Sequence, residues 1–169
     1  PLPDIAARIR AFLAMAKARG LSADFHVDET LDTSSNTLKM IAQAVLETGF
    51  SAPVVVGHCC SVSAMHESEA LATLDVVARA GLHVVSLPMC NLYLQDRHAA
   101  RTPRMRGITL VHEMAARGIN VSFASDNTRD PFYAYGDLDV LEVLREATRI
   151  GHLDHSGPDW VQTVLANPA

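Results

Sequence analysis

PVVVGH, residues 53–58, is a run of β-branched residues that ends in a glycine and a histidine. An uninterrupted apolar run of this kind is typical of a strand buried on both faces, as in a parallel sheet covered by helices. Comparable strands are predicted at 23–27, 83–87 and 120–126, with helical patterns between them. The sequence therefore predicts an α/β fold built from parallel βα units within a single domain.

Apolar residues recur at helical spacing in six segments. The predicted helices cover residues 4–19, 36–48, 66–80, 108–117, 137–150 and 158–166. Asn36 is a good N-cap for the second helix, and residues 88–106, which carry four arginines, are expected to form a polar loop. An open, doubly wound sheet and a (β/α)₈ barrel both fit this alternation. Pattern alone favours the open sheet, because a barrel needs about 250 residues.

The composition excludes several classes of protein. The 169 residues are 49% apolar and 20% charged, as in an ordinary globular protein. A net charge of −5 provides no basic surface for nucleic acid, and no apolar run approaches the roughly 20 residues that span a bilayer. Cys59, Cys60 and Cys90 lack the spacing of a zinc or redox motif and predict reduced, mostly buried thiols in a cytoplasmic protein. Because residue 1 is proline, we expect processing or a longer parent chain.

Polar residues of metal-binding type lie near the carboxyl ends of three predicted strands. They are His26, His58 and Asp126. Because the carboxyl ends of parallel strands build the active site, we expect these side chains to converge on one site. Imidazole nitrogen and carboxylate oxygen are common ligands of catalytic Zn²⁺ or Fe²⁺. Asp28 and Glu29 follow His26, and the pattern leaves either of them as the catalytic base.

Four stretches resemble the metal-dependent amidohydrolases, specifically the cytosine deaminase branch. FHVDE (25–29) is similar to that family's fifth-strand motif, and VVGHCCSVSAMH (55–66) to its sixth-strand stretch. LPMCNLYLQDR (87–97) with TPRMRGIT (102–109) resembles the seventh-strand loop, and INVSFASDNTRDPFY (119–133) the eighth strand. The resemblance implies that residues 1–169 are a single fragment of the catalytic domain. It would hold strands five to eight of a (β/α)₈ TIM barrel, without the first-strand H-x-H pair.

The resemblance also implies the chemistry and the roles of individual residues. It implies that the protein deaminates cytosine or a related aminated ring with one divalent metal, Fe²⁺ or Zn²⁺. His26 and Asp126 resemble the metal ligands, and Asp126 also shuttles a proton. Glu29 resembles the residue that protonates the ring nitrogen, which favours it over Asp28. His58 resembles the histidine that holds the attacking hydroxide and binds metal in some relatives.

Three further residues are expected to contact the substrate, which is a small heterocycle. Asn127 stands where cytosine deaminases carry a second aspartate, so a creatinine-like ring or an aminated triazine is an alternative substrate. Phe132 is placed to cover the ring, and His66 to contact it from the start of a helix. The competing hypothesis is a non-catalytic half-barrel that forms homo-oligomers or pairs with a missing N-terminal half. Its open sheet edges would favour such association.

Overall fold

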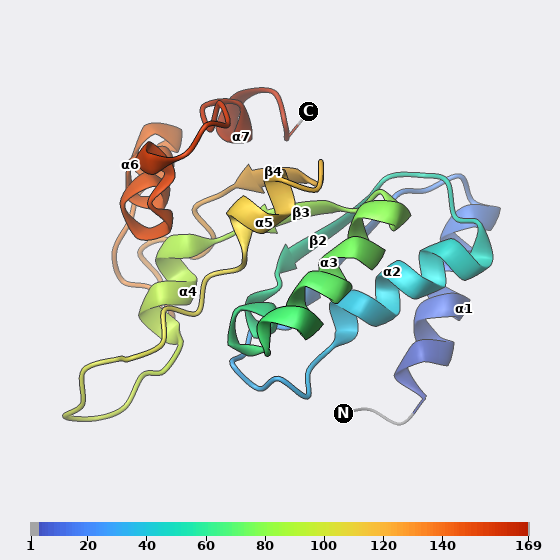
Figure 1. Ribbon diagram of the computed structural model, residues 1–169, viewed down its shortest axis with the longest axis horizontal. Helices are drawn as coiled ribbons and strands as arrows, with labels where there is room; N and C mark the ends of the chain where they lie inside the picture. Colours follow the sequence, from blue (N-terminus) through green and yellow to red (C-terminus); the bar gives the residue numbers. More distant parts are fainter. Residues whose placement is uncertain (1–3, 169) are drawn as a thin grey trace.

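The sheet has four parallel strands that follow one another in chain order (Figure 1). The computed structural model describes residues 4–168. The strands are β1 (Ala23–Val27), β2 (Val54–His58), β3 (His83–Ser86) and β4 (Asn120–Phe123). In the register between β1 and β2, His26 lies opposite Gly57 and Val27 lies opposite His58. The two histidines therefore reach the same end of the sheet.

The strand order decides between the two architectures that the pattern left open. A doubly wound sheet reverses its order at a switch point, as in the orders 3-2-1-4-5-6 and 2-1-3-4-5. Here the order is β1-β2-β3-β4 without a reversal. Because parallel crossovers are right-handed, a constant direction of travel puts the crossover helices on one face of the sheet. The open-sheet interpretation is therefore wrong, and the prediction of consecutive βα units of a barrel is confirmed.

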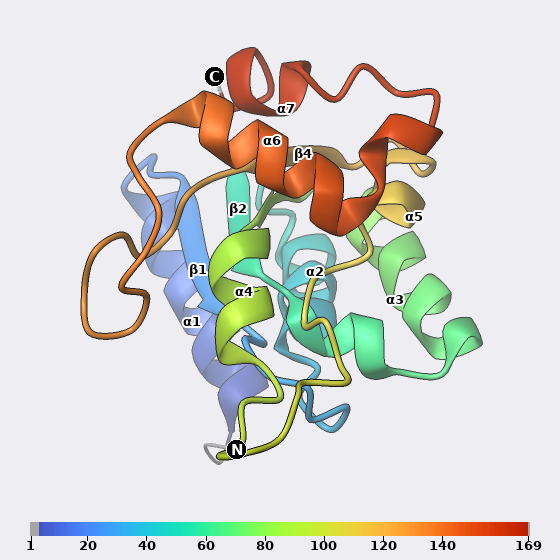
Figure 2. The ribbon, with the colours of Figure 1, turned by 90° about the vertical axis from the view of Figure 1, so that its left-hand side faces the viewer.

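Seven α-helices and two short 3₁₀ helices connect and flank these strands in residues 4–168. The α-helices are α1 (Ile5–Ala18), α2 (Thr37–Thr48), α3 (Glu67–Ala80), α4 (Pro88–Leu94), α5 (Val111–Ala115), α6 (Val140–Gly151) and α7 (Gln162–Leu165). The 3₁₀ helices are η1 (Cys60–Ala64) and η2 (Leu153–His155). α1 packs on α2, α2 on α3 and α3 on α5, whereas α4 packs on α6 beyond the strand ends (Figures 1 and 2). None of the helices in this part of the chain has the length and apolar character needed to cross a bilayer.

The predicted polar loop at 88–106 is wrong at its start, where α4 forms. Pro88 occupies the first turn of α4, a position at which its fixed φ and missing N–H are no disadvantage. Pro88, Met89, Cys90 and Asn91 are all buried. The remainder of the segment is the long connection that projects away from α4 in Figure 1. The helices predicted at 108–117 and 158–166 are confirmed as α5 and α7, which are shorter than predicted.

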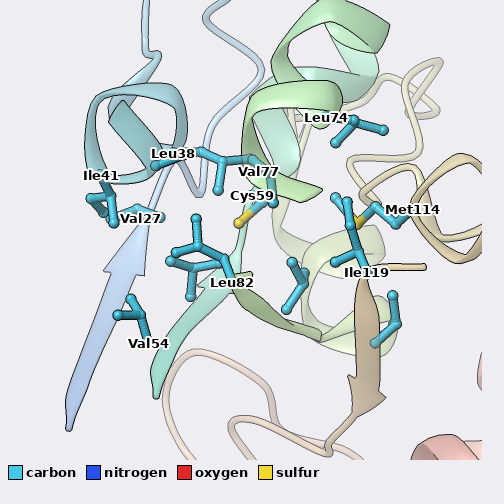
Figure 3. Packing of buried hydrophobic residues seen from close by; sticks show 14 of the residues in the cluster. Val27, Leu38, Ile41, Val54, Cys59, Leu74, Val77, Leu82, Met114 and Ile119 are labelled. Carbon is cyan, nitrogen blue, oxygen red and sulfur yellow. The ribbon is translucent and has the colours of Figure 1, made fainter. Parts of the chain in front are cut away.

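The hydrophobic core lies between the sheet and the crossover helices (Figure 3). Val54 and Val56 of β2 point into it, where they meet buried residues such as Leu38, Ile41 and Val77. Each such side chain contributes about 1.5–3 kcal/mol when it is fully buried. The alternate strand residues point to the opposite face. That second face, called the open face below, carries the exposed side chains of β1.

The open face is where the first strand presents its histidine. Along β1, Ala23 and Val27 are buried, whereas Asp24 and His26 are exposed. Phe25 points back to the helices, and its ring packs edge-on against Phe12 of α1 at 5.2 Å between centroids. The two-residue period of the strand therefore puts His26 on the side away from α1 and α2.

Candidate active site

His26, Glu29 and His58 converge at the carboxyl ends of β1 and β2. His26 Nε2 lies 3.1 Å from Glu29 Oε2, and His58 Nδ1 lies 3.6 Å from Glu29 Oε1. The two imidazole rings are 4.1 Å apart between centroids. One ligand-type atom from each residue lies within 4.8 Å of the others. These three side chains, called the His–Glu–His cluster below, are therefore close enough to share one cation or one small ligand.

The backbone leaves its extended conformation where the cluster forms. Asp28 has φ 53° and His58 has φ 67°, both in the left-handed region that non-glycine residues seldom adopt. At these positions the two-residue alternation of the strand no longer fixes where a side chain points. His58 can therefore meet His26, although Val54 and Val56 of the same strand point into the core.

Asp28 has a structural role that separates it from Glu29. Its carboxylate accepts hydrogen bonds from Ser35 Oγ at 2.8 Å, Thr37 N at 3.1 Å and Leu38 N at 2.8 Å. The last two are backbone donors in the first turn of α2, which otherwise have no partner within the helix. Asp28 thus caps α2 from a distance, while Asn36, the expected N-cap, makes no side-chain capping bond.

Burial sets the protonation of His58, whose side chain is only 4% exposed. Burial lowers the pKa of His58 below its ordinary value of 6.5, and the positive charge of His26 lowers it further. The negative charges of Glu29 and Asp126 oppose this effect without overcoming it. His58 is therefore a neutral imidazole at neutral pH. In that form one ring nitrogen donates a hydrogen bond and the other accepts one.

Asp126 lies beyond the end of β4, beside the cluster but not within it. Its backbone is left-handed, with φ 62°. Within residues 4–168, Asp126 Oδ2 is a buried atom that no hydrogen-bond donor reaches. A buried, unpartnered carboxylate oxygen is costly unless a cation or a proton satisfies it. Asp126 is close enough to His58 and Cys90 for its charge to act on the pKa of both groups.

The three expected substrate contacts do not join the cluster in the described part of the chain. The Asn127 amide donates to Asp130, and Phe132 is 65% exposed in the following loop. His66 is exposed at the N-terminus of α3, where its Nδ1 lies 2.9 Å from Ser68 Oγ. Their roles in substrate binding stay predictions.

Asn91 on the unexpected helix α4 and Gln95, the residue that follows the helix, are the site residues that sequence reasoning missed. Asn91 Nδ2 donates to Glu29 Oε1 at 3.2 Å and lies 2.9 Å from His58 Nδ1. Gln95 Nε2 donates to the Glu29 carbonyl oxygen at 3.3 Å. The available signal was their position: both follow the carboxyl end of a predicted strand, the end at which parallel α/β barrels build their active sites.

Two hollows lie near this end of the sheet. A groove of about 400 Å³ on the open face is bordered by His26, His58 and Leu87, among others. A larger hollow of about 550 Å³ lies between α4, the long connection and α6, and the cluster does not line it. Tyr93 and Tyr133 pack edge-on within its lining, 5.3 Å apart between ring centroids. We locate the candidate chemistry at the smaller groove, because His26 and His58 of the cluster line it.

The cysteines are suited to packing rather than to nucleophilic chemistry. All three are free and buried, as the sequence predicted. Burial and, to a smaller extent, the negative charges of nearby carboxylates together raise the pKa of Cys60 and of Cys90 to about 12. Burial also raises the pKa of Cys59 well above its ordinary value. At neutral pH these groups are thiols, whereas the nucleophile of cysteine chemistry is the thiolate.

Comparison with known proteins gives one family and several related enzymes. The sequence model described as "Amidohydrolase family" matches residues 2–169. A pterin deaminase from Rhizobium rhizogenes is 57% identical over 167 residues, which is 99% of this chain and 38% of that protein. The chain thus spans about two fifths of the length of this relative.

Two solved structures share the fold. A 5-methylcytosine deaminase from Klebsiella pneumoniae liganded with 5-fluorocytosine superposes with a TM-score of 0.86 at 28% identity, covering 96% of this chain and 40% of that one. An N-isopropylammelide isopropylaminohydrolase from Burkholderia multivorans superposes with a TM-score of 0.71 at 22% identity, covering 96% and 38%. At that identity the second likeness concerns the fold alone.

Proposed function

Because this chain belongs to the amidohydrolase family, we propose that its full-length protein hydrolytically removes an exocyclic amino group from a nitrogen heterocycle. Water adds to the ring carbon that bears the amine, the carbon–nitrogen bond breaks, and the products are a ring carbonyl and ammonia. The observation that carries this proposal is the His–Glu–His cluster at the carboxyl ends of β1 and β2. The 57% identity to a pterin deaminase supports an aminopteridine as the first substrate to test, ahead of cytosine.

The donor set fits the divalent metal that this family generally uses. The cluster offers imidazole nitrogen and carboxylate oxygen within 4.8 Å, and Asp126 adds a buried oxygen without a partner among the described residues. These are the ligand types of Zn²⁺ and Fe²⁺ sites. We assign His26 and Asp126 as the residues that would hold the ion. A bound divalent ion lowers the pKa of water and so makes a nucleophile available at neutral pH.

We propose that Glu29 transfers the proton that the ring needs. Its Oε1 is held by Asn91, and its Oε2 faces His26, which borders the groove. The Glu29 carboxylate takes a proton from the attacking water, and it gives this proton to the adjacent ring nitrogen, which becomes basic as the oxygen adds to the amino-bearing carbon. A positioned acid of this kind contributes about 10²–10⁴-fold to the rate.

His58 and Asp126 complete the proposed set. Asp126 takes the remaining proton from the added hydroxyl group and passes it to the amine; the carbon–oxygen bond becomes a carbonyl as the amine leaves as ammonia. His58 is neutral and buried, so it positions the attacking oxygen through a hydrogen bond without adding charge. Asn127, Phe132 and His66 are proposed to contact the ring when the substrate is bound.

The isolated 169-residue chain is proposed to be inactive. Its groove lies on an exposed sheet face, and β1 and β4 are the edge strands of the sheet in the described residues. We propose that this face is completed by the rest of the parent protein or by a second copy of the chain. The chain's coverage of 38% of the pterin deaminase supports the first of these partners.

The test is ammonia release by the purified full-length protein. Pterin, cytosine, 5-methylcytosine, creatinine and an aminotriazine are compared at equal concentration. We expect release from a pterin at the highest rate and none from the isolated 169-residue chain. A full-length protein that releases ammonia from none of these rings would contradict the proposal.

A further inference from the structure

We propose that Asn91 is a positioning residue that holds Glu29 and His58 together through a single amide nitrogen and thereby fixes the tautomer of His58. The geometry of the three side chains stands by itself, and only its catalytic meaning rests on the proposed function. Asn91 comes from α4, far along the chain from both residues that it contacts.

Burial and backbone hydrogen bonds hold Asn91 in place. It is only 1% exposed, and it is the middle residue of α4, the helix that follows β3. Its backbone N–H donates to Leu87 O at 3.0 Å, and its carbonyl oxygen accepts from Gln95 N at 3.0 Å. Gly107 approaches α4 so closely that an added Cβ would lie 3.1 Å from Asn91 O. The helix therefore has little freedom to move the amide away from the cluster.

The orientation of the amide follows from the chemistry of Glu29. An ionised carboxylate can only accept hydrogen bonds, so the amide nitrogen, not its oxygen, must face Glu29 Oε1. The same nitrogen lies 2.9 Å from His58 Nδ1. An amide NH₂ group donates two hydrogen bonds and accepts none. His58 Nδ1 must therefore be the acceptor, and the ring proton must be on Nε2.

This tautomer gives His58 a defined function. With its lone pair on Nδ1 engaged by Asn91, His58 presents an N–H donor at Nε2. It is then suited to bind an oxygen atom of water or substrate, and not to donate an Nε2 lone pair to a cation. Meanwhile Glu29 is fixed at two points, at Oε1 by Asn91 and at its carbonyl by Gln95.

The tautomer is tested without any measurement of activity. Full-length protein labelled with ¹⁵N-histidine is compared with the Asn91→Asp variant, and a His58→Gln variant identifies the signals of His58. In the wild type we expect an unprotonated, pyridine-type shift for His58 Nδ1 and a protonated shift for Nε2. Because a carboxylate can only accept, Asn91→Asp should move the proton to Nδ1. A protonated Nδ1 in the wild type, or no change in the variant, would overturn the proposal.

Kinetics test whether this positioning serves the reaction. Asn91→Leu has a similar volume and no donor, and we expect kcat to fall about 100-fold with little change in KM, as for a misplaced catalytic group. The same substitution in a Glu29→Gln background should cost much less, because the group that Asn91 positions is already disabled. Equal losses in both backgrounds would mean a merely structural role and would overturn the proposal.

The chain offers a matched control at the opposite end of the sheet. Asn120 Nδ2 lies 2.8 Å from His83 Nδ1, an asparagine–histidine pair of the same kind at the amino ends of β3 and β4. Asn120→Leu should leave kcat unchanged, and an equal loss of kcat there would also overturn the assignment. If the wild type releases no ammonia from any ring, the proposed function fails, while the ¹⁵N result still decides the role of Asn91.

Discussion

Replacing Asp28 with asparagine tests whether Asp28, which caps α2, has a role separate from that of Glu29, the proposed catalytic acid. The Asp28 carboxylate accepts two backbone N–H groups of α2, from Thr37 and Leu38, and one hydroxyl group, from Ser35. An amide keeps one accepting oxygen and turns an NH₂ group toward the other donors, so at least one of them loses its partner. Loss of an N-cap costs about 0.5–2 kcal/mol, and a hydrogen bond to a charged group contributes about 1.5–3 kcal/mol.

We therefore expect Asp28→Asn to destabilise the start of α2 by about 2 kcal/mol. Asparagine tolerates the left-handed φ of 53° at this position, so backbone strain does not add to the effect. Hydrogen exchange of the Thr37 and Leu38 amides, followed by mass spectrometry of the full-length protein, should accelerate about 30-fold. Glu29→Gln is the matched control and should leave this exchange unchanged. Unaltered exchange in Asp28→Asn, together with a loss of ammonia release as large as in the control, would mean that Asp28 is catalytic and does not cap α2.

Three other experiments test the packing at Gly107, the burial of Cys60 and the metal ligand His26. Gly107→Ala adds a methyl group at φ +68°, 2.4 Å or less from Gln95 side-chain carbons. Because the left-handed backbone alone costs about 1–2 kcal/mol, a thermal melt should show a lower Tm, and an unchanged Tm would contradict the close packing. Because its pKa is raised from 9.0 to about 12, Cys60 should react with iodoacetamide at pH 8 about 1,000-fold more slowly than an unperturbed thiol. The rate should rise as the pH approaches 12 or when the protein is denatured, and rapid alkylation of the native protein, seen by mass spectrometry, would contradict the burial of Cys60. His26→Ala should reduce the amount of divalent metal that the protein retains after dialysis, whereas Asp24→Ala, at an exposed position on the same strand, should not. Equal metal content in both variants would count against His26 as a ligand.

The strands were predictable because each is a short apolar run with clear ends. The predicted segments 23–27, 53–58 and 83–87 agree with β1, β2 and β3 within one residue at each end. Strand order was not predictable from periodicity, because both architectures produce the same alternation of strand and helix. The helix α4 escaped detection because seven residues give less than two full turns of pattern.

The site was predictable where strand geometry applies and not beyond it. His26 and His58 were found because the carboxyl ends of parallel strands meet at one edge. The choice between Asp28 and Glu29 lay outside that rule, because Asp28 leaves the extended conformation. Asn91 lay further outside, since its contact with Glu29 joins residues 62 positions apart. Such a contact depends on the packing of α4, which local sequence does not encode.

The proposed function depends above all on Glu29, within the His–Glu–His cluster, delivering a proton to an aminated ring. The most direct test is the rate of ammonia release from a pterin by the full-length Glu29→Gln variant, whose amide has the same shape as the acid but cannot transfer a proton. We expect the rate to fall by about 10²–10⁴-fold while the fold and the metal content are retained. A rate close to that of the wild type would mean that Glu29 does not deliver the proton.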